Sequence, residues 1–173
     1  MVIPEVLERN AELFGNEVAL VELNPEAKER HDSWKEFDLV ESIPVKRHRR
    51  EMTWAEFNER ANRTADLLAK KGIGRGDKVA ILLMNCLEWL PIYFGVLKLG
   101  ALAVPLNFRY TADEIKYCLG LADCCAIVFG GEFVERVDAI KDKIPKVKTV
   151  LFMEDVGEKC PAFAESYYGL LKD

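Results

Sequence analysis

Polar, charged and glycine residues stand directly after three short apolar runs of this sequence. They are Asn85 and Glu88 after the first run, Asn107, Phe108 and Arg109 after the second, and Gly130 and Gly131 after the third. Open parallel sheets bind ligands beyond the carboxyl ends of their strands. If the apolar runs are parallel strands, these residues share one edge of a sheet and are the candidates for a ligand site.

Arg109 is the strongest candidate in this set. It follows the predicted strand that ends near Pro105 and precedes the predicted start of a helix at Thr111. A guanidinium at such a position offers five N–H donors in a geometry that suits a phosphate, close to the positive end of a helix. The residues alone leave a surface ion pair open as an equal alternative for Arg109. For Asn85 they favour a role in holding the loop through hydrogen bonds to backbone groups. The alternative is that Asn85 lines a pocket.

Other patterns argue against a catalytic centre within this sequence. The stretch GIGRGD, residues 72–77, is rich in glycine, but it leaves a predicted helix and enters a predicted strand. A dinucleotide-binding loop has the reverse order, so we assign this stretch no phosphate. No constellation of serine, histidine and an acid is evident, nor a glycine-rich loop that ends in lysine. We therefore predict no catalytic residues here.

The elements that would position these residues alternate regularly from residue 53 onward. TWAE at 53–56 and TADE at 111–114 are capping boxes, in which a threonine and a glutamate close the first turn of a helix. We expect helices at 53–71, about 87–100, 111–121 and about 133–143, and strands at 78–85, 101–106, 124–130 and 148–153. This alternation predicts an α/β fold with a mainly parallel sheet and helices on both faces.

Two regions lie outside this alternation. The first 50 residues predict a short helix, a strand around residues 18–21 and a polar excursion at 24–50 inserted between two pairing strands. These strands would add a small antiparallel element. The last residues are connector-like, with a short helix at the end. We therefore divide the chain into residues 1–52, an α/β subdomain at 53–153 and a connector at 154–173.

Composition narrows the class of protein. The chain has 173 residues and a net charge of −5, which argues against a nucleic-acid partner because such proteins need a basic face. We expect the one basic cluster, residues 46–50, to be a solvated loop or an edge strand. No apolar run approaches the ~20 residues of a transmembrane segment. The acidic start lacks the pattern of a secretory signal, so we expect a cytoplasmic protein.

The cysteines predict neither a metal centre nor a disulfide framework. The five are Cys86, Cys118, Cys124, Cys125 and Cys160. They form no CxxC pair, and the chain has two histidines, so zinc ligands are not expected. Cys124 and Cys125 stand where a strand should begin, and we expect buried, reduced thiols there.

Residues 52–153 resemble the adenylate-forming acyl-CoA synthetases, a family related to luciferases and to the adenylation domains of peptide synthetases. The resemblance lies in MTWAEFNERANRTADLLAKKGIGRGDKVAILLMN, in LKLGALAVPLNFRYTADEI and in the later strand AIVF. AELFGNEVALVE near the start is also similar to the opening of that family. The LNFR segment resembles CoA ligases, whereas peptide-synthetase domains have an LDP-type turn there. The family points to a fatty-acyl or other carboxylate CoA ligase.

This resemblance implies a two-step reaction. A fatty or other carboxylic acid reacts with ATP to give an acyl-adenylate and pyrophosphate, and CoA then displaces AMP. ATP, Mg²⁺ and CoA are the implied cofactors of the full-length enzyme. Arg109 occupies the position of an arginine that resembles a contact for the CoA phosphates, and the resemblance supplies no catalytic residue or metal ligand within these residues.

Several family motifs have no counterpart here. They are the phosphate loop rich in serine, threonine and glycine, the adenine-binding and magnesium-binding motifs, and the lysine of the small C-terminal domain. We therefore expect an N-terminal fragment that is catalytically silent alone. A natural short binding module, or a fragment of an aryl-acid or luciferase-like adenylate former, remains the alternative. A truncated sheet would expose apolar surface, so the isolated chain is expected to self-associate.

Overall fold

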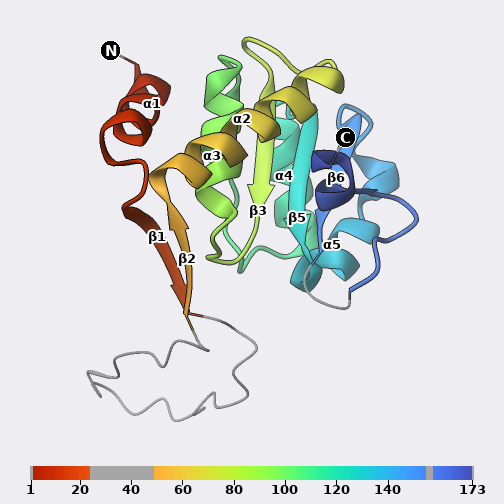
Figure 1. Ribbon diagram of the computed structural model, residues 1–173. Coiled ribbons are helices and arrows are strands. Elements are labelled where there is room, and N and C mark those ends of the chain that lie inside the picture. The colour runs from red at the N-terminus through yellow and green to blue at the C-terminus, as the bar shows by residue number, and fades with distance from the viewer. Residues whose placement is uncertain (1, 24–48, 155–157, 173) are drawn as a thin grey trace.

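A five-stranded parallel sheet with helices on both faces forms the body of the protein, as the alternation predicts (Figure 1). The structure is a computed structural model that describes residues 2–23, 49–154 and 158–172. The strands lie in the order β4-β3-β5-β6-β7. Their bounds are β3 Lys78–Leu82, β4 Leu102–Pro105, β5 Ala126–Gly130, β6 Thr149–Met153 and β7 Glu165–Ser166.

Two layers of helices cover the sheet. The helices are α2 Trp54–Lys70, α3 Trp89–Lys98, α4 Ala112–Leu121, α5 Val134–Asp138 and α6 Tyr167–Leu171. Helices α2, α3 and α6 contribute to the hydrophobic cluster on one face, and α4 and α5 contribute to the cluster on the other. Among the described residues, no helix has the length and hydropathy to span a bilayer.

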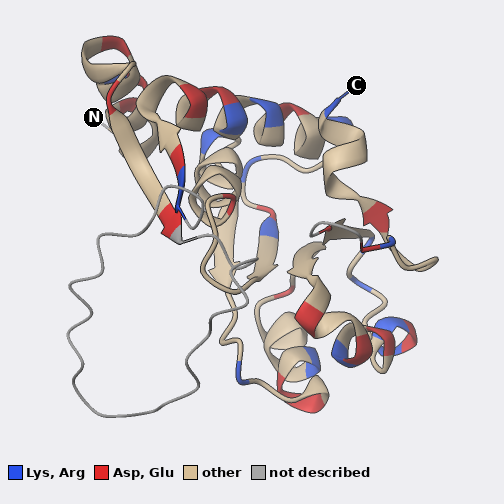
Figure 2. Ribbon diagram, turned by 60° about the horizontal axis from the view of Figure 1, so that its bottom comes forward, with Lys and Arg blue, Asp and Glu red and all other residues tan. Residues whose placement is uncertain are grey.

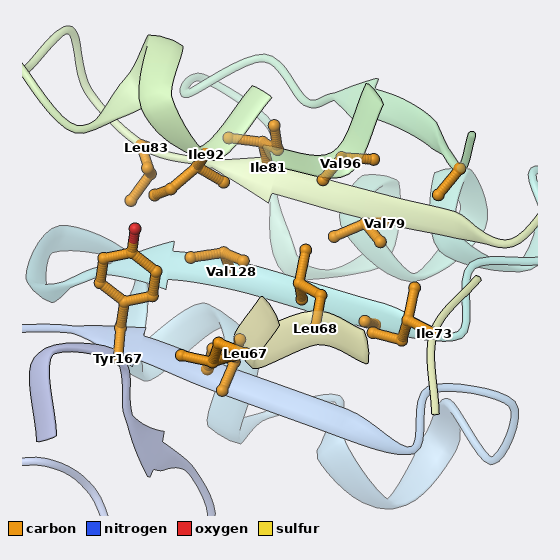
Figure 3. Packing of buried hydrophobic residues seen from close by; sticks show 13 residues of the cluster. Leu67, Leu68, Ile73, Val79, Ile81, Leu83, Ile92, Val96, Val128 and Tyr167 are labelled. Atoms are coloured by element: carbon orange, nitrogen blue, oxygen red, sulfur yellow. The ribbon is translucent and has the colours of Figure 1, made fainter. Parts of the chain in front are cut away.

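Strand β3 is buried on both faces, which explains why its sequence is continuously apolar rather than alternating. Val79 and Ile81 point into the cluster beneath α2 and α3, where Figure 3 shows them beside Val128 of β5. Ala80 and Leu82 point into the opposite cluster. All four side chains are fully inaccessible to solvent. The two central strands therefore separate two hydrophobic cores.

The last helix closes one of these cores through a buried polar contact. The Tyr167 hydroxyl lies 2.7 Å from the Thr64 hydroxyl of α2. The Thr64 hydroxyl donates its one hydrogen to the Arg60 carbonyl oxygen at 2.8 Å. It therefore accepts from the Tyr167 hydroxyl, which is the donor of the contact. Tyr167 is 1% exposed. Burial raises the pKa of its hydroxyl above the ordinary value, and the group stays neutral.

A small antiparallel ribbon precedes α2, as expected. Helix α1 (Ile3–Phe14) leads into β1 (Val18–Leu23), which pairs antiparallel with β2 (Arg49–Thr53). Arg49 and Arg50 of the basic cluster are exposed on this two-stranded element, in line with the edge-strand expectation. Residues 24–48, which hold the predicted insertion, lie outside the described residues. Several large apolar side chains of α1 and β1 are exposed, and self-association of the chain stays a prediction.

Local signals place the helix ends correctly. The Thr53 and Thr111 hydroxyls accept hydrogen bonds from the N–H groups of Glu56 and Glu114, and each glutamate accepts one from its threonine N–H at 2.8 Å. These backbone hydrogen bonds hold the pKa of both glutamates below the ordinary value. Gly72 ends α2 with φ of +80°, a conformation that favours glycine.

The structure departs from the expected elements chiefly in three places. The helix predicted at 133–143 is a 3-10 turn at Gly131–Phe133, the short helix α5 and a second 3-10 turn at Lys141–Lys143. Pro145 disfavours a helical residue before it, so the chain leaves the helix there and turns toward β6. The strand predicted at 78–85 ends at Leu82, and the residues after it form a loop. Strand β7 was not predicted, since two residues carry no periodic signal.

A close approach of α2 and α3 generates a stability prediction. A Cβ on Gly95 would lie 2.6 Å from the Thr64 Cβ and 3.0 Å from the Ala61 carbonyl oxygen. Gly95→Ala is therefore expected to lower the free energy of unfolding by about 1–3 kcal/mol through overpacking. The matched control is Gly120→Ala in α4, where no atom lies within 4 Å of the new Cβ. That variant should gain about 0.5–1 kcal/mol. Urea denaturation of both variants measures these two changes. A change of the same sign in both variants would contradict this packing.

Candidate functional site

The carboxyl edge of the sheet contains a change of winding direction. From β3 the chain passes through α3 to β4 on one side, and then returns through α4 to β5 on the other side of β3. The connections therefore diverge beyond the ends of β3 and β5, the kind of place where open α/β sheets bind ligands. Asn85 and Asn107 follow the ends of β3 and β4, and Gly130 is the last residue of β5, so the three lie at the same edge of three adjacent strands.

The loop between β4 and α4 presents Arg109 to solvent. The Arg109 N–H donates to the Asn107 side-chain oxygen at 2.9 Å, and the Tyr110 N–H donates to the Asn107 carbonyl oxygen at 3.0 Å. These bonds form a turn that ends at the Thr111 cap. The exposed Arg109 guanidinium carbon lies 5.5 Å from the centroid of the Phe108 ring. In the described part of the chain, no carboxylate pairs with Arg109, so the predicted ion-pair alternative is not found there.

Sequence reasoning missed a second arginine at this loop. Arg136 of α5 donates from Nη1 to the carbonyl oxygens of Phe108 at 2.7 Å and Tyr110 at 3.0 Å. The two acceptors flank Arg109 in the sequence. No local pattern could have indicated the contact, because Arg136 is 26 to 28 residues away along the chain.

Glu88 is the buried carboxylate of an ion-pair cluster rather than part of an exposed ligand edge. Its carboxylate, whose side chain is 3% exposed, binds Arg60 of α2 at 2.7 Å and Arg50 of β2 at 3.4 Å. Burial and then the Glu88 charge raise the pKa of the neighbouring Tyr168 hydroxyl. The cluster thus joins the ribbon, α2 and the start of α3. Its role is structural.

Glu22 of β1 extends this cluster to the loop after β3. Its carboxylate accepts a hydrogen bond from the Leu87 N–H at 2.8 Å and lies 3.8 Å from Arg50. Leu87 itself packs into the third hydrophobic cluster, together with Leu7 and Phe57. The loop that carries Asn85 is therefore held from its far end, while Asn85 itself is exposed.

A pocket of about 620 Å³ opens beside the cluster, between β2, α2 and α6. Its wall combines basic and acidic side chains, including Arg50, Arg60, Glu56 and Lys172. Figure 2 shows the same alternation of acidic and basic residues along α2. The two arginines already bind Glu88, so the pocket offers no concentrated charge for an ionic ligand, and we assign it none.

Packing explains the two glycines at the end of β5. A Cβ on Gly130 would lie 3.0 Å from a Glu132 carboxylate oxygen and 3.4 Å from a Leu83 methyl carbon. A Cβ on Gly131 would overlap the carboxyl group of Glu158. Both glycines allow neighbouring segments to approach the sheet edge closely. They lie where the sequence places them, but their contacts are internal.

The five cysteines are free thiols, and burial disfavours the thiolate form of Cys86 and Cys124. Burial, followed by the Glu88 charge, raises the pKa of Cys86 to about 12, and burial raises that of Cys124 to about 11. The thiolate is the reactive form, so both groups are inert near neutral pH. Within residues 2–23, 49–154 and 158–172, no group of three or more His, Cys, Asp and Glu side chains is placed to hold a metal ion.

Comparisons with known proteins agree on one family. The profile of the family described as "AMP-binding enzyme" matches residues 7–169. A medium/long-chain-fatty-acid–CoA/3-oxocholest-4-en-26-oate–CoA ligase of Mycobacterium marinum is 36% identical over 109 residues, which are 63% of this chain and 20% of that protein. Long-chain-fatty-acid–CoA ligase FadD13 of Mycobacterium tuberculosis is 38% identical over 99 residues, 57% of this chain and 20% of that protein.

A solved structure also matches this chain over only part of its own length. The inhibitor-bound N-terminal domain of FACL13 from Mycobacterium tuberculosis is 28% identical and superposes with a TM-score of 0.72, over 98% of this chain and 35% of that one. The chain thus spans about a fifth of the length of the curated relatives it matches.

The buried carboxylate generates a second stability prediction. Arg60→Leu removes the nearest cation from Glu88 and leaves Arg50 at 3.4 Å. Because Glu88 is buried while Arg60 is 41% exposed, we expect a loss of roughly 2 kcal/mol of unfolding free energy. The matched control is Arg63→Leu on the same helix, whose exposed pair with Glu59 should contribute about 0.5 kcal/mol or less. Equal losses in urea denaturation would refute a special role for Glu88.

Proposed function

The chain belongs to the AMP-binding enzyme family, and we propose that it forms the N-terminal part of an ATP-dependent acyl-CoA synthetase. The match over residues 7–169 is the observation that carries this proposal. The N-terminal domain of FACL13 supports it, because 98% of this chain superposes on 35% of that domain.

The proposed reaction has two displacement steps. In the first, a carboxylate oxygen of the substrate attacks the α-phosphorus of ATP, and pyrophosphate leaves with the electrons of the broken P–O bond. In the second, the CoA sulfur, having lost its proton, attacks the acyl carbon of the adenylate, and AMP leaves. Mg²⁺ would neutralise phosphate charge in the first step. The described residues offer no cluster of metal ligands, so we assign none of them to Mg²⁺.

Arg109 is the residue of this chain that we assign to CoA. Its guanidinium is exposed at the carboxyl edge of the sheet and has no carboxylate partner among the described residues. A planar fork of N–H donors binds phosphate oxygens through charge-assisted hydrogen bonds. The side chain would thereby bind and orient CoA through a phosphate, remote from the sulfur that reacts. It takes no part in bond making.

Fatty acids are the substrate class that the relatives favour. The two curated relatives at 36% and 38% identity are both named as fatty-acid–CoA ligases. An anthranilate–CoA ligase superposes with a TM-score of 0.77, but its 24% identity supports a common fold alone. We therefore place a fatty-acyl substrate ahead of an aryl acid.

The assignment of Arg109 is tested in the complete ligase that we propose contains this chain. Arg109→Ala should raise the KM for CoA roughly 10- to 100-fold, the range expected when a hydrogen bond to a charged group is lost. Pyrophosphate exchange driven by ATP and a fatty acid should stay unchanged, because CoA takes no part in that half-reaction. Arg75→Ala, at the opposite edge of the sheet, is the matched control. An unaltered CoA dependence would remove Arg109 from the site.

The 173-residue chain alone should be catalytically silent. Incubated with ATP, Mg²⁺, fatty acids and labelled pyrophosphate, it is expected to show no exchange above background, because we assign no residue of this chain to adenylate formation. The complete ligase serves as the positive control. Exchange by the isolated chain would contradict the proposed division of the active site. Silence of both proteins would favour a binding module over a ligase.

A further inference from the structure

We propose that Arg136 is a positioning residue for the anion site at Arg109. It would hold the β4–α4 loop in the conformation that presents the Arg109 side chain. Its effect on CoA binding rests on the proposed function, whereas its effect on the loop stands on the geometry of the chain itself.

A single guanidinium nitrogen spans the backbone on both sides of Arg109. Nη1 of Arg136 donates to the carbonyl oxygens of Phe108 at 2.7 Å and Tyr110 at 3.0 Å. Neither carbonyl accepts a hydrogen bond from a backbone N–H in the described part of the chain. The positive charge of Arg136 strengthens both bonds, because one partner is ionised. Arg136 is therefore the described donor to both carbonyls, and it adds to the turn that the two hydrogen bonds to Asn107 form.

Arg136 is itself held in place by the packing of α5. Its guanidinium carbon lies 5.4 Å from the centroid of the Phe133 ring, which is buried beneath the sheet. Val137 on the same short helix is also buried. No carboxylate among the described residues pairs with Arg136, so its charge is available to the loop carbonyls. The backbone that carries Arg136 is thus packed against the sheet, whereas Phe108 and Arg109 of the loop are exposed.

The contact spans the end of the central strand. Strands β4 and β5 lie on either side of β3, and the loop follows β4 whereas α5 follows β5. Arg136 therefore bridges the connections that follow β4 and β5, whose helices α4 and α5 lie on the same face of the sheet. Arg109 lies within the bridged segment. Among the described residues, its guanidinium has a ring contact with the adjacent Phe108 and neither a hydrogen bond nor an ion pair. Its position thus depends on the backbone that Arg136 holds.

The first experiment measures the loop directly in the 173-residue chain. Hydrogen exchange of peptides covering residues 106–111 should become about tenfold faster or more in Arg136→Gln, since the charged donor to both carbonyls is lost. Arg136→Lys keeps the charge and should give a smaller increase. Lys141→Gln is the matched control, because Lys141 lies nearby over the Phe163 ring and contacts Asp138 rather than the loop. Its exchange should equal that of the parent chain.

Global unfolding is separated from loop release by the peptides of α2 and α3. Their exchange and the Tm should change little in Arg136→Gln. If that variant fails to fold, Arg136→Lys takes its place, with a smaller increase expected that is again confined to the loop. Unchanged exchange at 106–111 in a folded Arg136 variant overturns the proposal, and so does an increase spread evenly over all peptides.

The second experiment joins the two arginines in a double-mutant cycle in the complete ligase. Arg136→Gln should raise the KM for CoA about tenfold and leave pyrophosphate exchange unchanged, and Arg136→Lys should recover part of the loss. In an Arg109→Ala background the Arg136 substitution should add less than about twofold, because it acts through Arg109. Additive effects would overturn the positioning role. If Arg109→Ala alone leaves CoA dependence unchanged, the CoA assignment fails, and the exchange experiment still decides whether Arg136 holds the loop.

Discussion

The absence of water on either face of β3 and β5 is the constraint on which the rest of the structure depends. Backbone N–H and C=O groups in such strands must be satisfied by neighbouring strands, since no solvent reaches them. Strand β3 pairs with β4 and β5, and β5 pairs with β3 and β6. Polar and charged side chains can then contact solvent or a ligand only beyond the ends of the strands. The loop with Arg109 lies at such an edge because the interior admits no unpaired charge.

The hydrophobic core between the sheet and helices α4 and α5 depends on the same burial of β5. Phe129 and Phe152 lie on adjacent strands with ring centroids 5.4 Å apart, and Phe133 and Val137 complete their surroundings. This packing fixes α5 against the sheet and so fixes the guanidinium that reaches the β4–α4 loop. Stability and the presentation of Arg109 therefore share residues, although Arg109 itself contributes little to the core.

Local physical chemistry carries most of what the sequence predicts. Thr53 and Thr111 cap helices through hydrogen bonds within three residues, and Gly72 adopts a conformation that other residues disfavour. The apolar run of β3 is visible because both of its faces are buried. The remainder depends on contacts between distant residues. No sequence pattern reveals the contact of Arg136 with the β4–α4 loop or that of Glu88 with Arg60. The sequence alone therefore groups Glu88 with the edge residues and gives no signal for Arg136.

The hydroxyl contact between Thr64 and Tyr167 has a consequence for how the chain is made. The two residues are 103 positions apart, and Tyr167 completes the buried surface that faces α2. During translation, α2 emerges from the ribosome long before its covering helix does. The Thr64 hydroxyl then remains hydrated, and the adjoining apolar side chains remain accessible to chaperones, until residue 167 has left the exit tunnel. Completion of this core therefore waits for residue 167 to leave the exit tunnel, whatever the intrinsic speed of helix formation.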